Sequence, residues 1–353
     1  MTIQALAQQV SAQQVSAQQV SAQQVSAQRA LVLGGTEFAG RHLVTALLAG
    51  GAAVSLFNRA LTNPGLFPAA EQLVGDRHAD VAALVGREWD VVYDLSAYHP
   101  DDVVRCGQVL AGHTGHYVFV STISAYADLA EPGVTEDAPL AELTGPIPEK
   151  FERELYGPLK ALCEARVVGL FPGATIIRPT IIVGPHDPTD RFTYWVQRLS
   201  EPGAHLMPPD VAASVQYIDA RDLGDFMVLA GTRRLAGPFN LAAPPVTFTD
   251  LVAAIAAETG ASVEPISLGV EELAAAGVAA WSDLPLVIST DEPELRGMFQ
   301  VTQQRAAAAG LMIRPLRRTV RDILDWLADR GDVPLRTGLS PQREAELVAR
   351  YGR

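Results

Sequence analysis

The sequence contains little cysteine and no long apolar run. Cys106 and Cys163 are its only cysteines, too few for a disulfide framework and consistent with a reducing environment. No apolar stretch reaches the roughly 18–20 residues that a membrane-spanning helix needs. The N-terminus also lacks the basic flank and apolar stretch of a secretory signal. These absences predict a cytoplasmic protein without a membrane partner.

Positive charge is scarce as well. Lysine and arginine together number 27 against 40 aspartates and glutamates, which gives a net charge of -13. A nucleic-acid binder needs a basic face to neutralise phosphates, so no nucleic-acid partner is expected. The seven histidines show no metal-ligand spacing, their closest pair being His113 and His116. The composition therefore predicts neither a nucleic-acid interface nor a metal site.

Lysine is the rarer of the two basic residues. Only Lys150 and Lys160 are lysines, and every other basic side chain is an arginine. An ammonium group is a compact charge on a flexible stem that acts at close range in a confined site. Because this sequence otherwise uses arginine for positive charge, Lys160, four residues after Tyr156, indicates a task that a guanidinium does not perform.

The composition divides the chain into three parts. Residues 1–28 are dominated by a Val-Ser-Ala-Gln-Gln repeat, whose period gives no common apolar helix face, so we expect a low-complexity polar arm outside the fold. Residues 29–185 alternate short apolar runs with helical stretches and predict a dinucleotide-binding domain. Residues 186–353 contain Pro- and Gly-rich loops and Ala-rich helices, and predict mainly a smaller, partly interleaved substrate-binding lobe with C-terminal helices.

The first domain is predicted to be an α/β fold with a doubly wound parallel sheet, the Rossmann architecture. Its apolar runs are continuous rather than alternating, as in strands buried on both faces. The expected strands are 30–33, 53–57, 90–95, 117–120 and 174–177. The expected helices are 41–48, 78–86, 101–111, 157–169, 249–258, 271–277, 316–328 and 341–350.

A glycine-rich turn, Gly34-Gly35-Thr36-Glu37-Phe38-Ala39-Gly40, joins the first expected strand to the first expected helix. Gly34 permits a tight turn, and Gly40 lets the helix pack closely on the strand. The helix N-terminus then presents free N–H groups to a pyrophosphate. Glu37 is unusual in such a turn, and we expect it to face solvent or to pair with Arg59. The turn predicts a dinucleotide site.

The end of the second expected strand bears on the choice of cofactor. An NAD site usually carries an acidic residue there, which holds the ribose 2′-hydroxyl. Here the strand ends in Asn58-Arg59, so the acid is missing, and the forked donors of Arg59 suit a 2′-phosphate. We therefore expect NADP as the preferred cofactor, with NAD as the alternative.

The candidate catalytic residues follow the fourth expected strand. Thr122 lies at the carboxyl edge of the sheet, where its hydroxyl can donate to a substrate carbonyl or a developing alkoxide. Tyr156 and Lys160 share one helix face because they are four residues apart. A tyrosine with a pKa near ~10 is a poor acid–base catalyst at neutrality. A nearby ammonium stabilises the phenolate and lowers that pKa.

In this order of motifs the chain resembles the extended short-chain dehydrogenase/reductase superfamily, which includes NAD-dependent epimerases and dehydratases. The resemblance covers about residues 29–330 and rests on Gly34–Gly40, Asp76, Leu95-Ser96-Ala97, Ser121-Thr122, Tyr156-x-x-x-Lys160 and Arg178-Pro179. It implies that Tyr156 is the general acid/base and that Lys160 also binds the nicotinamide ribose. It implies further that Thr122, with Ser121 and Ser124 as alternatives, orients the substrate oxygen.

The resemblance also assigns cofactor contacts and identifies one departure. It implies that Asp76 meets the adenine and that Leu95 and Ser96 border the cofactor. Gly157-Pro158 directly follows the tyrosine. Proline disfavours helical geometry in the residue before it, so we expect Tyr156 at the mouth of its helix.

Three functions remain open from the sequence. The first is an NADP-preferring oxidoreductase that transfers hydride to or from a carbonyl or secondary alcohol of a small molecule. The second is an NAD-dependent nucleotide-sugar epimerase, which the missing acid at Asn58 disfavours. The third is a non-catalytic dinucleotide- or RNA-binding protein, which the acidic charge and the Thr/Tyr/Lys set disfavour. The resemblance disfavours a 4,6-dehydratase, because Ile123-Ser124 stands where such enzymes carry an Asp-Glu pair.

Two further expectations concern the substrate and the assembly. The side chains that could line the substrate cleft are His186, Asp187, Arg191, Tyr194, Trp195, Gln216 and Tyr217. Many relatives dimerise through the two helices near 101–111 and 157–169, so the resemblance implies a homodimer.

Overall fold

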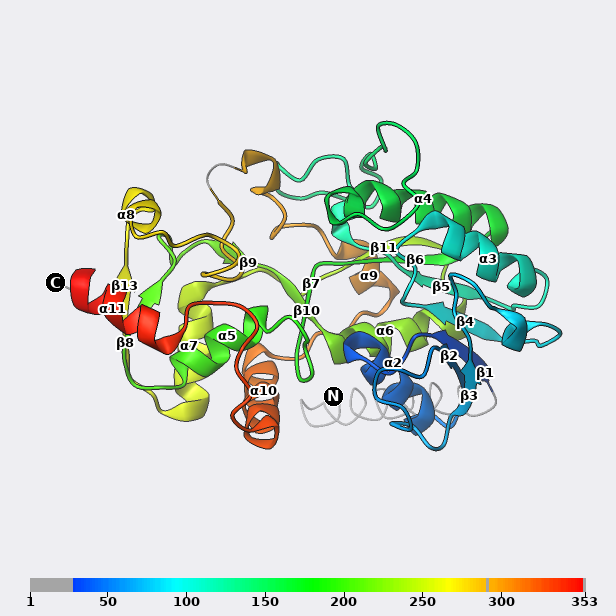
Figure 1. Cartoon of the computed structure of the whole chain (residues 1–353), viewed down its shortest axis with the longest axis horizontal. Helices are drawn as coiled ribbons and strands as arrows, with labels where there is room; N and C mark the ends of the chain where they lie inside the picture. The colour runs from blue at the N-terminus through cyan, green and yellow to red at the C-terminus, as the bar shows by residue number, and fades with distance from the viewer. Residues whose placement is uncertain (1–27, 290–291, 352–353) are drawn as a thin grey trace, which may run out of the picture. The chain divides into compact units, whose positions relative to one another are not determined.

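The computed structural model describes residues 28–289 and 292–351 (Figure 1). The expected polar arm, residues 1–28, lies outside this range except for Gln28. The described chain forms two compact units, each built from several separate stretches of the sequence. The first unit comprises the described residues up to Ala125 together with Glu142–Ile177 and Leu223–Pro238, and the second comprises Tyr126–Ala141, Arg178–Asp222 and the described residues from Phe239 onward.

A seven-stranded sheet forms the centre of the Rossmann fold, in the order β11-β6-β5-β4-β1-β2-β3. All neighbouring pairs from β6 to β3 are parallel. Its strands are β1 (Arg29–Leu33), β2 (Ala53–Asn58), β3 (Glu71–Val74), β4 (Val91–Asp94), β5 (Tyr117–Val120), β6 (Thr175–Pro179) and β11 (Gly237–Leu241). Because β2 and β4 flank β1, the strand order reverses beside β1, where α/β sheets bind their ligands.

Helices cover both faces of this sheet, α3 and α4 on one and α2 and α6 on the other (Figure 1). Their bounds are α2 (Phe38–Ala49), α3 (Pro100–Leu110), α4 (Tyr156–Leu170) and α6 (Ala220–Arg233), with single turns η1 (Ala82–Leu84), η2 (Ile123–Ala125) and η3 (Arg153–Leu155). A Cβ on Gly107 of α3 would lie 2.5 Å from Leu170 Cδ1 of α4, so these two helices pack closely. The doubly wound architecture predicted from the sequence is confirmed.

The helix expected over 78–86 is wrong, because only the short turn η1 forms there. Two aspartate side chains satisfy backbone N–H groups that a helix would otherwise use. Asp76 Oδ1 accepts from His78 N at 2.9 Å, and Asp80 Oδ1 accepts from Ala82 N at 2.9 Å. Such local side-chain bonds compete with helix formation.

The core of the first unit fills the space between the sheet and α3 and α4. Leu31, Phe119, Cys163 and Val167 belong to one fully buried cluster. Tyr117 stacks on Phe171 with ring centroids 4.1 Å apart. Burial of this cluster, at about 25 cal/mol per Å² of apolar surface, stabilises the packing of α3 and α4 on the sheet.

The second unit contains three two-stranded sheets, β10-β7, β12-β9 and β13-β8. The strands are β7 (Ile181–Val183), β8 (Gly203–Met207), β9 (Ser214–Val215), β10 (Tyr217–Asp219), β12 (Val246–Thr247) and β13 (Val263–Ser267). The remaining helices are α5 (Arg191–Leu199), α7 (Phe248–Thr259), α8 (Val270–Ala275), α9 (Gln304–Ala309), α10 (Leu316–Arg330) and α11 (Pro341–Tyr351), with the turn η4 (Pro293–Leu295).

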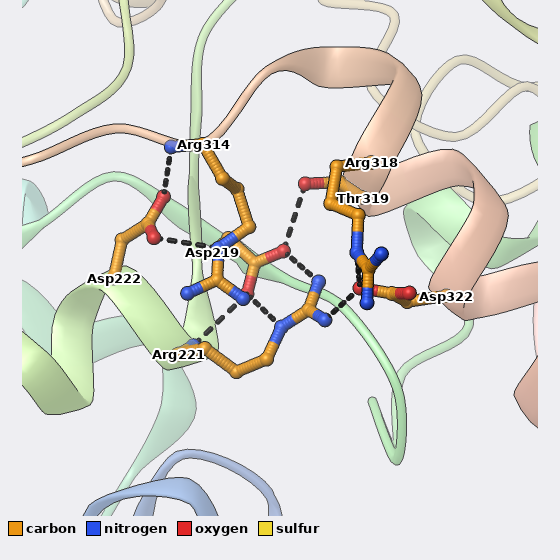
Figure 2. Close-up of polar contacts among 7 residues, drawn as sticks. All are labelled: Asp219, Arg221, Asp222, Arg314, Arg318, Thr319 and Asp322. Carbon is orange, nitrogen blue, oxygen red and sulfur yellow. Dashed lines mark hydrogen bonds and ion pairs between the residues drawn. The ribbon is translucent and has the colours of Figure 1, made fainter. Parts of the chain in front are cut away.

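An ion-pair network joins the end of β10 to α10 within the second unit (Figure 2). Buried Asp219 accepts from Arg221 Nε at 2.8 Å and from Thr319 Oγ1 at 2.8 Å. Arg221 also pairs with Asp322, and Arg314 Nε donates to Asp222 Oδ1 at 2.6 Å. Every buried charge in this group has a partner of opposite sign, which a buried charge requires.

Candidate active site

The glycine turn has the backbone geometry that the sequence predicted. Gly34 (φ 111°) and Gly35 (φ 96°) both lie in the left-handed region, which side chains disfavour. A Cβ on Gly40 would lie 2.8 Å from Gly35 Cα, too close for any other residue, so α2 sits directly on the turn. Glu37 is exposed and gives the helix no side-chain cap, so the first-turn N–H groups keep their capacity to bind an anion.

Two asparagine side-chain amides donate hydrogen bonds to backbone carbonyls of this turn. Asn58 Nδ2 donates to Gly34 O at 3.2 Å, and Asn63 Nδ2 donates to Thr36 O at 2.9 Å. The structure therefore places Asn58 as a support of the glycine turn, while Arg59 beside it is exposed. Thr36 is buried and Phe38, at the first position of α2, is half-buried.

A buried ion pair that sequence reasoning missed lies beside the turn. Arg77 binds Asp94, the last residue of β4, through Nη1–Oδ1 at 2.7 Å and Nη2–Oδ2 at 2.9 Å. Tyr117 Oη donates to Asp94 Oδ2 at 2.8 Å. Burial opposes ionisation of Asp94, but the guanidinium outweighs it and holds the pKa of this carboxyl below its ordinary value. The sequence offered one sign of this pair, a charged residue ending an apolar strand.

The ion pair fixes Ser96, one of the residues expected to border the cofactor. Arg77 Nη1 donates to Ser96 Oγ at 2.8 Å, and Ser96 Oγ donates to Leu33 O at 3.1 Å. A Cβ on Gly34 would lie 3.6 Å from Ser96 Cβ. Ser96 and the neighbouring half-buried Leu95 therefore stand against the glycine turn. Asp76, the residue before Arg77, is half-buried at the end of the same sheet.

Tyr156 and Lys160 lie at the start of α4. Tyr156 is the first residue of this helix, which confirms the expectation drawn from Gly157-Pro158. Lys160 is 2% exposed, and its Nζ donates to Ala97 O at 2.9 Å and to Val120 O at 2.6 Å. The ammonium thus joins the carboxyl ends of β4 and β5 and keeps a third donor. Burial lowers the pKa of Lys160 to about 8.

The hydroxyl residues after β5 differ in their partners. Thr122 Oγ1 accepts from Ser124 N at 3.1 Å, which leaves its own proton available for donation. Ser121 Oγ is buried and has no hydrogen-bond partner. Ser124 is exposed. Both Thr122 and Ser121 therefore keep a donor at the edge of the sheet.

Most of the side chains expected to contact substrate in the second unit are structural instead. Tyr194 (0% exposed) and Trp195 (1%) belong to the core, and Trp195 Nε1 donates to Pro285 O at 2.7 Å. Gln216 is buried and holds Val301 through its amide. Tyr217 is also buried. These expectations are wrong because residue type alone does not tell a core aromatic from one that lines a site.

The segment around His186 keeps unusual features. His186 (φ 69°) and Asp190 (φ 57°) have left-handed backbones. Arg330 binds Asp190 through two hydrogen bonds, of 2.6 and 3.0 Å. Asp187 Oδ2 is buried without a partner, and burial raises the pKa of this carboxyl to about 6. His186 and Arg191 are half-buried.

Neither a metal centre nor a membrane span occurs in the described part of the chain. No group of three or more His, Cys, Asp or Glu side chains within residues 28–289 and 292–351 is arranged to hold a metal ion. His116 is buried against Thr175 Oγ1 at 2.8 Å, and burial lowers its pKa to about 4. Among the same residues, no helix has the length and apolarity to cross a bilayer.

Comparison with known proteins shows similarity in structure only. No protein-family model and no curated protein sequence matches the chain. A UDP-glucose 4-epimerase structure is 16% identical, with a TM-score of 0.64 over 88% of this chain and 99% of that one. WbmH of Bordetella bronchiseptica in complex with NAD+ is 17% identical, with a TM-score of 0.62 over 86% and 100%.

A third solved structure agrees with these two. The UDP-glucuronic acid 4-epimerase of Bacillus cereus in complex with NAD is 15% identical, with a TM-score of 0.60 over 87% of this chain and 99% of that one. The alignments cover both units of the chain, and each neighbour is matched over nearly its full length. The chain therefore has the fold of these solved structures, two of which are nucleotide-sugar 4-epimerases.

Proposed function

We propose that this protein is an NAD(P)-dependent oxidoreductase that acts on a carbonyl or secondary alcohol of a small molecule. The observation that carries the proposal is the placement of the buried Lys160 ammonium. It donates to Val120 O, at the end of β5 two residues before Thr122, and to Ala97 O, in the loop after β4 next to Ser96. A glycine turn, a hydroxyl residue and a Tyr–Lys helix on one sheet edge form the set that hydride transfer with acid–base assistance requires.

The residues of the first unit fit a dinucleotide. Gly34 and Gly35 have the positive φ of a tight turn, Gly40 lets α2 pack on that turn, and the first turn of α2 offers N–H groups without a side-chain cap. Thr36, Phe38, Asp76, Leu95 and Ser96 complete the set of proposed contacts. When bound, the nicotinamide supplies or accepts the hydride.

The chain's own residues handle the proton. Tyr156 delivers a proton to the substrate oxygen or removes it, while Thr122 donates its free hydroxyl proton to the same oxygen. The ammonium of Lys160 lowers the energy of the Tyr156 phenolate electrostatically. Its third donor is available for a ribose hydroxyl. Replacing Tyr156 with Phe removes the transferable proton, so turnover should fall by about 10²–10⁴-fold. Normal turnover of a confirmed substrate by Tyr156→Phe would contradict the proposal.

We propose NADP as the preferred cofactor, with Arg59 at the 2′-phosphate and Asn58 beside it supporting the glycine turn. Arg59 is exposed directly after β2, where a 2′-phosphate would need a cation. Titration with NADPH and NADH by intrinsic fluorescence tests this. The Arg59→Ser variant should bind NADPH at least about tenfold more weakly and NADH unchanged. Arg166→Ser, an exposed arginine on α4, is the matched control.

A nucleotide-sugar epimerase is the second candidate, favoured by the solved structures of 4-epimerases that share the fold. An epimerase regenerates its cofactor within the site and therefore retains it, whereas a reductase exchanges it. Purified protein that carries stoichiometric NAD and interconverts UDP-glucose and UDP-galactose would favour the epimerase. An empty site with NADPH-dependent ketone reduction would favour the reductase. Cofactor binding without any turnover would favour a non-catalytic dinucleotide-binding protein.

We also propose a cytoplasmic homodimer. Cys106 and Cys163 are free and buried, and burial raises the pKa of both thiols to about 12, so they suit a reducing compartment without forming a disulfide. The outward faces of α3 and α4, which include exposed Val168, are the proposed interface. Sedimentation that gives a monomer mass at every concentration would refute the dimer.

A further inference from the structure

Two exposed aromatic side chains stand beside Tyr156. Tyr98 is 47% exposed and Phe151 is 43% exposed. Every other aromatic side chain in the described residues is buried or half-buried. Leaving large apolar surface in water is unfavourable. The two exposed rings are 53 residues apart in the sequence but lie next to each other in the fold. Exposed apolar side chains that cluster in this way often mark a binding site.

The three rings form a triangle. Tyr98 and Phe151 have centroids 5.5 Å apart, and each lies 6.2 Å from the Tyr156 ring. The Tyr98 ring also lies 5.6 Å from Lys160 Nζ. Tyr98 thus lies beside both residues that the proposed function assigns to proton transfer, and Phe151 lies beside Tyr156. We define Tyr98 and Phe151 as the aromatic rim.

A histidine fixes the two segments that carry the rim. His99 Nε2 lies 2.8 Å from Pro148 O, and Asp101 N lies 3.3 Å from His99 Nδ1. A carbonyl oxygen only accepts and a backbone N–H only donates. Nε2 therefore donates to Pro148 O, and Nδ1 accepts from Asp101 N. This cross-link ties the loop after β4 to the segment that leads into Phe151, so the rim is held by more than its own ring contacts.

The charges around the rim favour an uncharged ligand. Residues 149–154 read Glu-Lys-Phe-Glu-Arg-Glu and are all exposed, so acids outnumber bases there. The phenol of Tyr98 is neutral near pH 7, because the ordinary pKa of a tyrosine is about 10. The nearby ammonium of Lys160 is buried and donates to two carbonyl oxygens. The exposed residues beside Phe151 add no cationic excess, so the ring faces suit a flat apolar ring better than a phosphate or carboxylate.

We propose that the aromatic rim is the substrate-specificity element of this site and that it holds an uncharged, flat ring attached to the reacting carbonyl carbon by a short chain. The proposal rests on the proposed function for the location of the reacting carbon. It assigns to Tyr98 and Phe151 a role in binding only, because neither phenyl nor phenol is needed for the proton transfer given to Tyr156.

The test compares 4-phenyl-2-butanone with 2-butanone, which share the carbonyl and differ in the ring. Dissociation constants are measured by ligand-observed NMR on the full chain with and without NADPH. The wild type should bind the ring compound about tenfold more tightly, the value of one aromatic stacking contact. Phe151→Ala and Tyr98→Leu should each lose most of that preference, whereas Tyr98→Phe and Val85→Ala, at an exposed valine away from the site, should retain it.

The possible outcomes test the aromatic rim and the proposed function independently of each other. Ring-dependent binding without NADPH oxidation by either ketone would support the rim and contradict the reductase. Equal binding of both ketones by the wild type, or an unchanged preference in Phe151→Ala and Tyr98→Leu, would overturn the rim whatever the turnover. A fall from dimer to monomer mass in the two rim variants would also overturn it, because the rings would then serve an interface between copies of this chain.

Discussion

A Cβ on Gly157 would lie 2.2 Å from the carbonyl oxygen of Ser124. Gly157 directly follows Tyr156 in α4, and Ser124 belongs to the turn η2 after β5. The absence of a side chain therefore allows the helix that carries Tyr156 and Lys160 to rest on the turn that carries Thr122. Gly157 therefore has a packing function.

Substituting Gly157 with Ala should separate these two elements. Because the obstacle is a backbone oxygen, either α4 or η2 must shift, and overpacking of this kind destabilises by about 1–3 kcal/mol. Urea unfolding measures the loss. Gly169→Ala is the matched control in the same helix, because a Cβ there meets nothing within 4 Å and alanine is the better helix former by about 0.5–1 kcal/mol. Equal stability of the two variants would contradict this account.

Lys160 should make stability depend on pH in the alkaline range. Burial lowers its pKa from 10.5 to about 8 in the folded chain, so between these values the unfolded chain binds more protons. The free energy of unfolding should therefore rise with pH from about 8 to 10.5, by on the order of 3 kcal/mol. Lys160→Met removes this term, and the difference between the two pH profiles isolates it from other titrating groups. Parallel profiles would show that the ammonium is not desolvated.

The same lysine should not be replaceable by arginine. Its Nζ lies within 2.9 Å of two carbonyl oxygens, and the larger planar guanidinium does not fit this point-like site. Lys160→Arg should lose about 10²-fold or more in kcat for a confirmed substrate despite the conserved charge. Steady-state kinetics check this, and Lys150→Arg, at the other, exposed lysine, should keep normal rates.

Asp219 should be the most sensitive residue of the network in Figure 2. Burial raises its pKa and the Arg221 guanidinium more than reverses this, so the pKa lies below its ordinary value. Its contribution is present at neutral pH and is lost as the pH falls through that lowered pKa. Asp219→Asn leaves the half-buried Arg221 and Arg314 under-compensated beside a buried position and should destabilise by about 3–5 kcal/mol.

A surface arginine in the same network provides the comparison. The Arg318 side chain is 64% exposed and pairs with Asp322 from one helical turn away, so Arg318→Ala should change the free energy of unfolding by less than about 0.5 kcal/mol. Urea unfolding at pH 7 measures both variants. A small effect of Asp219→Asn would mean that Arg221 and Arg314 find other partners.

Asp187 should destabilise the fold at neutral pH. Burial raises the pKa of this carboxyl from 3.8 to about 6, so stability should fall as the pH rises through that window and stay low above it. Asp187→Asn keeps an acceptor for the Thr189 N–H and removes the charge, and should stabilise by on the order of 2 kcal/mol at pH 7 and little at pH 4. Asp210→Asn, an exposed aspartate with the same local bond to the residue two positions on, should have no such effect.

The sequence alone determined the features that depend on near neighbours. Continuous apolar runs predicted the parallel strands, because a strand buried on both faces has no polar side. The glycines at 34, 35 and 40 predicted the turn, because positive φ and close helix packing exclude side chains there. The Tyr156–Lys160 spacing predicted a shared helix face, because residues four apart align at 3.6 residues per turn.

Only the tertiary structure decided which distant residues meet. Trp195 is the same residue type whether it lines a site or fills a core, and its bond to Pro285 O comes from a chain segment 90 positions away. The ion pair of Arg77 with Asp94 and the ring contact of Tyr98 with Phe151 depend on strand order and loop packing. Local sequence spacing does not predict either of them. Local periodicity specifies the helices and strands, whereas the burial and the contacts of a side chain follow from how those elements pack. The glycine turn could therefore be predicted from the sequence, and the aromatic rim could not.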